Sequence, residues 1–179
     1  MGESSFVKRA TQVVVLAAVA AIAVRVFLID SFIVKGESMA PTIIEGDYVF
    51  VDKRAYASKE PSRGDIIVGA FRGLDVRAIK RIVAVPPEWV TVTPDTVFVQ
   101  LGREASTTPL DDRAQLSLAG YGSNGATTTY RLDPFEYFVL GDNRALSEDS
   151  RDLGPVDKFA LQGRVIARFR ISDLTLEFY

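Results

Sequence analysis

The chain has 179 residues, 47% of them hydrophobic, and a formal net charge of −2, a size that fits one apolar segment plus about one soluble domain. It contains neither histidine nor cysteine, which excludes Ser-His-Asp triads, cysteine nucleophiles and the usual His/Cys zinc sites. A Ser–Lys pair needs neither residue and is still possible, whereas the absence of a polybasic patch argues against nucleic acid as a partner.

The first predicted element is an apolar helix over residues 11–29. Val13 to Val24 form twelve consecutive apolar residues before Arg25 interrupts the run. As a helix, residues 13–29 extend about 25 Å, close to the roughly 30 Å of a hydrocarbon core. The sequence therefore predicts one N-terminal transmembrane helix. The alternative is a cleaved signal peptide, but its small-x-small motifs lie inside the apolar run, which leaves too short an apolar region before them.

The charges before this helix predict its orientation. Lys8 and Arg9 precede the apolar run, so the positive-inside rule predicts a cytoplasmic segment over residues 1–10. Residues 30–179 would then form an extracytoplasmic domain, held at the plasma membrane by a single span.

Short runs rich in β-branched and aromatic residues follow, and Gly, Pro or Asp separates them. This pattern predicts a mainly β, antiparallel domain. The predicted strands are 48–52, 65–68, 77–85, 90–92, 97–99, 137–140 and 165–169. Residues 102–131 are rich in Ser, Thr and Gly, which predicts a loop-rich segment with at most one hairpin.

Two residues carry a chemical signal. Ser38 lies nine residues past the predicted helix, where a hydroxyl nucleophile would work at the membrane surface. A serine needs a base within hydrogen-bond reach. Lys80 lies beside Ile79 and Ile82, and apolar burial favours the neutral amine that can accept a proton. The bland alternatives are a capping serine and a surface lysine on an edge strand.

Three segments together resemble the type I signal peptidases, in particular the small bacterial enzymes with a single membrane span. Ser38-Met39-Ala40-Pro41-Thr42 resembles the family's nucleophile segment. Residues 63–68 with Ile79-Lys80-Arg81 resemble its lysine segment, and residues 141–151 resemble its C-terminal segment. The resemblance implies an antiparallel β catalytic domain with a smaller β or loop insertion at about residues 84–138.

The resemblance also implies roles for individual residues. Ser38 would be the nucleophile and Lys80 the general base, while Ser147 would orient the lysine amine. Asp149 and Arg151 would form a structural ion pair beneath the site, and Asp142 and Arg144 would give further support.

The oxyanion hole departs from part of the family. The Ser38 backbone N–H can stabilise an oxyanion, but the second donor is often a Ser or Thr at the position that Gly36 occupies here. A glycine has no hydroxyl, so Gly36 leaves this donor unassigned.

Apolar residues at matching positions are expected to form two substrate pockets. The P3 pocket would be lined by Phe32, Val49, Val68 and Ile79, and the P1 pocket by Val34, Met39 and Ile43. Each could equally be plain core packing.

The function that these features predict is a membrane-anchored serine endopeptidase that removes signal peptides from exported preproteins after Ala-x-Ala. Its partners would be preprotein signal peptides and membrane lipid, and it would need no metal or cofactor. The alternatives are a self-cleaving protease similar to the SOS repressors, which the N-terminal helix argues against, and an inactive membrane-anchored β scaffold that binds signal peptides.

Overall fold

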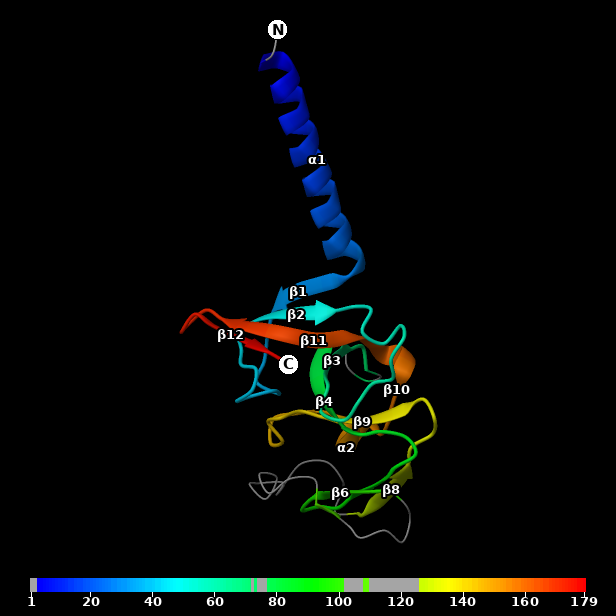
Figure 1. Cartoon of the computed structure of the whole chain (residues 1–179). Helices are drawn as coiled ribbons and strands as arrows, with labels where there is room; N and C mark the ends of the chain where they lie inside the picture. The colour runs from blue at the N-terminus through cyan, green and yellow to red at the C-terminus, as the bar shows by residue number, and fades with distance from the viewer. Residues whose placement is uncertain (1–2, 72, 74–76, 102–107, 110–125) are drawn as a thin grey trace.

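In the computed structural model of the protein, the residues described are 3–71, 73, 77–101, 108–109 and 126–179. Figure 1 shows one long helix, α1 (Glu3–Phe27), standing away from a body made mainly of strands. The body contains two antiparallel sheets, so the predicted mainly β, antiparallel fold class is confirmed.

The larger sheet has the strand order β1-β2-β11-β3-β4-β9-β10, with β12 paired to β11. Its strands are β1 (Ile29–Ile33), β2 (Tyr48–Asp52), β3 (Ile66–Gly69), β4 (Ala78–Ala84), β9 (Glu136–Leu140), β10 (Val156–Asp157), β11 (Leu161–Arg170) and β12 (Thr175–Phe178). Two short helical elements, α2 (Ser150–Leu153) and the 3-10 turn η2 (Lys158–Ala160), lie between β9 and β11.

The smaller sheet is formed by the chain between β4 and β9, where the insertion was predicted. Its strand order is β7-β6-β5-β8, with β5 (Trp89–Val92), β6 (Val97–Gln100), β7 (Thr108–Pro109) and β8 (Thr128–Arg131). It forms the end of the body farthest from α1 (Figure 1). Most of the predicted loop-rich segment, residues 102–131, lies outside the described residues.

The N-terminal helix ends earlier than predicted. The predicted anchor reached residue 29, but α1 ends at Phe27 and Ile29 already begins β1. The reason is strand pairing, because Ile29 lies opposite Asp52 and the Lys53 N–H donates to the Leu28 carbonyl. Among the described residues, no helix combines the length and the apolar character needed to span a membrane. The predicted transmembrane anchor is therefore not confirmed.

Over the described ranges, two strands of the larger sheet have an edge without a partner strand, and both edges face one cavity. In the described residues β1 pairs with β2 alone, so its other edge is open. On β4, pairing with β9 begins at Arg81, so within the described part of the chain Ala78 and Ile79 also keep an open edge. The segments 32–36 and 77–79 line one cavity, which means that the two open edges face a common space.

Three buried apolar clusters hold the body together, and all three include residues of β4. Ile79 belongs to a cluster with Val49 and Val68, whereas Ile82 belongs to a second cluster with Ile67. Both faces of β4 are therefore covered. A polar side chain on this strand has to find its partners inside the protein.

Candidate active site

Lys80 is buried in the middle of β4. Only 3% of its surface is exposed, because the strand is packed on both faces and Lys80 pairs with Ile67 of β3. Burial lowers the pKa of the Lys80 ammonium, an effect that the Asp149 charge opposes and the Arg151 charge reinforces. A lysine in such surroundings is suited to hold a neutral amine, the form that accepts a proton.

The Lys80 amine has a defined hydrogen-bond partner. Its Nζ atom donates to Ser147 Oγ over 2.9 Å, and both side chains are buried. The contact joins β4 to the loop that follows β9. It fixes the direction of the lysine side chain, because Ser147 is itself only 2% exposed.

Gly141 brings this pair close to Ser38. A Cβ atom added to Gly141 would overlap both Ser147 Oγ and the Ser38 carbonyl oxygen. The same carbonyl accepts a 3.0 Å hydrogen bond from the Asn143 N–H. The chain can therefore bring Ser38 and Ser147 to opposite sides of Gly141 only because this residue has no side chain.

Asp149 and Arg151 form the ion pair that was expected beneath the site. Arg151 Nε donates to Asp149 Oδ1 over 2.9 Å, and the side chains are 2% and 0% exposed. The other carboxylate oxygen accepts the Gly141 N–H over 2.9 Å. Arg151 Nη2 also donates to the Ser147 carbonyl over 3.1 Å. One buried pair thus holds the backbone of Gly141 and of Ser147, the hydrogen-bond partner of the lysine amine.

Asp142 and Arg144 form further hydrogen bonds that hold the backbone around the buried groups. Asp142 accepts two hydrogen bonds of 2.8 and 2.7 Å from Arg81, the residue after Lys80. Arg144 Nε donates to the Gly141 carbonyl over 2.9 Å. Both residues therefore fix backbone segments that carry the buried groups.

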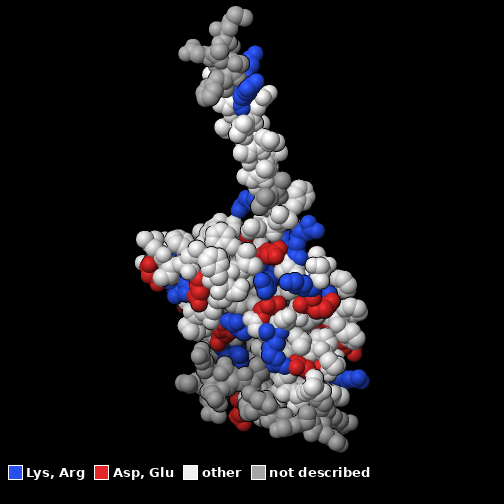
Figure 2. Space-filling model, viewed as in Figure 1, with Lys and Arg blue, Asp and Glu red and all other residues white. Residues whose placement is uncertain are grey.

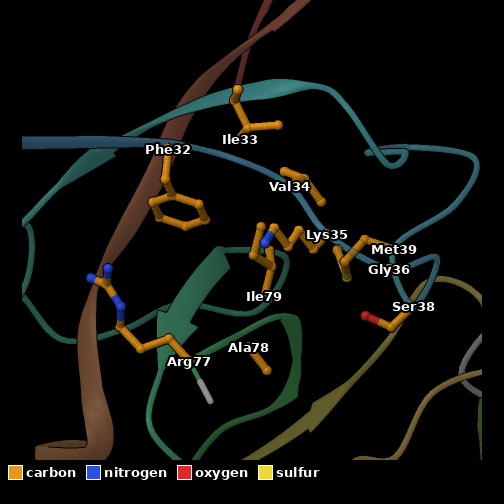
Figure 3. A pocket seen from close by; sticks show the side chains of 10 residues that line it. All are labelled: Phe32, Ile33, Val34, Lys35, Gly36, Ser38, Met39, Arg77, Ala78 and Ile79. Atoms are coloured by element: carbon orange, nitrogen blue, oxygen red, sulfur yellow. The ribbon is translucent and has the colours of Figure 1, made fainter.

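A cavity of about 470 Å³ lies beside Ser38, which forms part of its wall. Figure 3 shows Ser38 and Met39 at one end, Phe32 and Arg77 at the other, and Val34 with Ile79 between them. The lining residues are Phe32, Ile33, Val34, Lys35, Gly36, Ser38, Met39, Arg77, Ala78 and Ile79. The middle of the cavity is mainly apolar, while Lys35 and Arg77 add positive charge to its walls.

The predicted pocket residues divide into two groups. Phe32, Val34, Met39 and Ile79 line the cavity, whereas Ile43 and Val49 do not and are fully buried. Val49 lies opposite Phe32 in the strand pairing, so it belongs to the core beneath the pocket wall. Val68 lines a neighbouring cavity instead. Sequence reasoning missed Ile33, Lys35, Arg77 and Ala78, although the last two directly precede Ile79 and Lys80 in the chain.

Gly36 lies on the cavity wall with a backbone φ of +89°. Residues with a Cβ rarely adopt this left-handed conformation. The backbone here therefore favours glycine, which accounts locally for the missing hydroxyl.

A half-buried serine at the wall of an apolar cavity, with a buried lysine behind it, fits a serine hydrolase that works without histidine. Comparison with known proteins specifies this class. Residues 7–170 match the family described as signal peptidase, peptidase S26. The chain belongs to this family, and it is a serine peptidase that removes signal peptides.

Two relatives found by sequence agree with this assignment. A signal peptidase I of Bacillus licheniformis is 33% identical over 152 residues, which cover 84% of this chain and 81% of the relative. Signal peptidase IB of Staphylococcus aureus is 29% identical over 152 residues, covering 80% and 78%. A crystal structure of signal peptidase I from Enterococcus faecalis is 27% identical, with a TM-score of 0.44, and covers 59% of this chain and 97% of that one.

The close approach at Gly141 leads to a first prediction. Gly141→Ala should lower kcat/KM by about 100-fold or more, because displacement of a catalytic group by about 1 Å costs rates of this order. The measurement is cleavage of a preprotein by the purified full chain in detergent, together with a thermal unfolding curve.

Ala145→Ser is the matched control, because it adds one atom to an exposed residue of the same loop and should leave the rate unchanged. Wild-type activity in folded Gly141→Ala would contradict the close approach of Ser38 and Ser147.

Proposed function

We propose that Ser38 is the nucleophile and Lys80 the general base of this signal peptidase. The observation that carries the proposal is the buried Lys80 amine, hydrogen-bonded to Ser147 beside the loop that holds Ser38. Ser147 orients the amine without taking part in bond-making. The Asp149–Arg151 pair acts through Ser147 and Gly141 and is a positioning element.

The proposed reaction has two stages. The neutral Lys80 amine takes the Ser38 hydroxyl proton while Ser38 Oγ attacks the scissile carbonyl, and the Ser38 backbone N–H stabilises the resulting oxyanion. The peptide bond then breaks, and the protonated lysine gives its proton to the leaving amine. In the second stage Lys80 activates a water molecule that hydrolyses the acyl-serine ester and releases the signal peptide.

The substrate would bind as an extended strand between the open edges of β1 and β4. The N–H and C=O of Val34 both bond toward β2, so those of its neighbours Ile33 and Lys35 point to the open edge. A peptide can pair there by β-strand addition. Val34 and Met39, near Ser38, would receive the P1 side chain, and Phe32 with Ile79 would receive P3. Small apolar pockets of this kind favour cleavage after Ala-x-Ala.

We also propose that α1 holds the enzyme at a membrane. Its apolar side chains are exposed, including Val13 at 66%, Leu16 at 71% and Phe27 at 69%. In Figure 2 the helix is white between basic side chains near its N-terminal end and at its base. Exposed apolar surface of this extent favours transfer from water into lipid. The proposed orientation has residues 1–10 in the cytoplasm and residues 30–179 outside.

The pair itself is tested by substitution. Ser38→Ala and Lys80→Met should each lower kcat/KM by at least about 1,000-fold, since nucleophile and base act as a unit. Methionine fills the space of lysine without a basic nitrogen and should preserve the fold. The exposed Lys59 provides the control Lys59→Met, which should keep wild-type activity.

Folded Lys80→Met with near wild-type activity would show that another group is the base. An inactive wild-type protein that still binds signal peptides would favour the scaffold alternative.

Membrane attachment is tested with vesicles of phosphatidylcholine and phosphatidylglycerol. The full chain should sediment with the vesicles, whereas Val15→Asp with Val19→Asp should leave it in the supernatant, because two charges on the helix oppose its transfer into lipid. Leu101→Asp changes an exposed apolar residue of the body and should not alter sedimentation. A wild-type chain that stays in the supernatant would contradict the proposal, and resistance to carbonate extraction would distinguish a spanning helix from one lying on the surface.

A further inference from the structure

The substrate cavity does not end at Phe32. A second cavity of about 330 Å³ is lined by Asp30, Phe32, Val51, Lys53, Val68, Arg77 and Gln162. It shares Phe32 and Arg77 with the substrate cavity, so the two adjoin at this pair of side chains. Figure 3 shows the pair at the end of the substrate cavity farthest from Ser38. We call the second space the Arg77 cavity.

The spacing along β1 relates the Arg77 cavity to a position in the substrate. Side chains two residues apart share one face of a strand, so Asp30, Phe32 and Val34 follow one another on the same face. A peptide strand paired with β1 advances by about 6.6 Å for every two residues. If P1 lies at Val34 and P3 at Phe32, as in the proposed function on which this step rests, P5 reaches Asp30 and Arg77.

The walls of the Arg77 cavity carry three charged side chains, those of Asp30, Lys53 and Arg77. The Arg77 guanidinium lies 5.4 Å from the centre of the Phe32 ring and donates to Asp30 over 3.0 Å. Burial alone would raise the pKa of Asp30, but hydrogen bonds from Arg77 and the Ser31 N–H and the charges of Arg77 and Lys53 lower it below the usual value. Asp30 is therefore ionised at neutral pH. One negative and two positive groups give these walls a net positive charge.

The uncharged residues that line the Arg77 cavity add a preference for the form of the bound side chain. Val51 and Val68 form an apolar part of the wall, while Gln162 offers an amide. A side chain with methylene groups and a terminal acceptor would contact all of these surfaces. Glutamate and glutamine have this form. Lysine and arginine would bring a third cation toward Arg77 and Lys53.

We propose that the Arg77 cavity binds the P5 side chain of the signal peptide and favours an acidic or amide residue over lysine or arginine. Arg77 is then a specificity-determining residue at some distance from the reacting atoms. Its ring contact with Phe32 and its ion pair with Asp30 hold the guanidinium at the boundary between the P3 and P5 positions. The cavity would discriminate among preproteins that share the same Ala-x-Ala motif.

The test is a set of preproteins that differ only at P5, with Glu, Gln, Ala or Lys, cleaved by the purified full chain in detergent. At low salt kcat/KM for Glu should exceed that for Lys by about threefold to tenfold, and the ratio should shrink as salt is raised, because the groups are partly exposed. Arg77→Gln should remove most of the preference. Arg77→Lys keeps the positive charge and should retain it.

Arg131→Gln is the matched control. Arg131 also has its guanidinium over an aromatic ring, 5.9 Å from the centre of Trp89, but in the smaller sheet. This variant should show the wild-type preference at P5.

A parallel series with Ala or Leu at P1 separates the two proposals. Equal cleavage of P5 Glu and P5 Lys, with strong rejection of P1 Leu, would overturn the role of the Arg77 cavity and leave the proposed function standing. Efficient cleavage after P1 Leu would instead overturn the proposed substrate register, and with it the P5 assignment.

Discussion

The burial of one lysine is the constraint on which the rest of this structure depends. A charged amine inside a protein is costly unless it is paired, and Lys80 has the Ser147 hydroxyl as its hydrogen-bond partner rather than a carboxylate. The Asp149 and Arg151 side chains pair with each other. Asp149 also accepts the Gly141 N–H, and Arg151 donates to the Ser147 carbonyl. The arrangement orients the amine while leaving it free to lose its proton.

The sheet supplies the other half of the site. In the described residues β1 and the beginning of β4 each keep an open edge toward one cavity, and in the proposed binding mode a peptide completes the sheet there. Main-chain hydrogen bonds of this kind do not depend on the side chains of the peptide, so selectivity among peptides has to come from the side-chain pockets. Val34 lines the substrate cavity near Ser38, Phe32 lines both cavities, and Asp30 lines the Arg77 cavity, so positions along β1 and just after it follow the proposed order of subsites. In this proposal the strand edges bind the peptide backbone and the cavities recognise the peptide side chains.

Much of this could be predicted from the sequence, and the misses have physical causes. Central strands such as β4 and β9 carry a strong β-branched and aromatic pattern. The absence of histidine left a Ser–Lys pair possible, and the resemblance to the type I signal peptidases assigned its two roles to Ser38 and Lys80. β1 was missed because its first residue, Ile29, continues the apolar run of α1 and the polar residues Asp30 and Ser31 then interrupt the strand pattern. Only its pairing with β2 identifies it as a strand. Ile43 and Val49 were expected in pockets because a sequence does not show on which side of a pocket wall an apolar residue lies. Arg77 was missed because a lone arginine is usually solvated.

The most direct test of the account is the pH dependence of kcat/KM for the full chain in detergent. A base that works in its neutral form loses activity as pH falls through its pKa. The account predicts an acidic limb well below the ordinary lysine value of about 10.4, because burial disfavours the charged amine, and it predicts that Ser147→Ala moves this limb. An acidic limb at the ordinary lysine value, or one that is unchanged in Ser147→Ala, would contradict the central role of the buried Lys80.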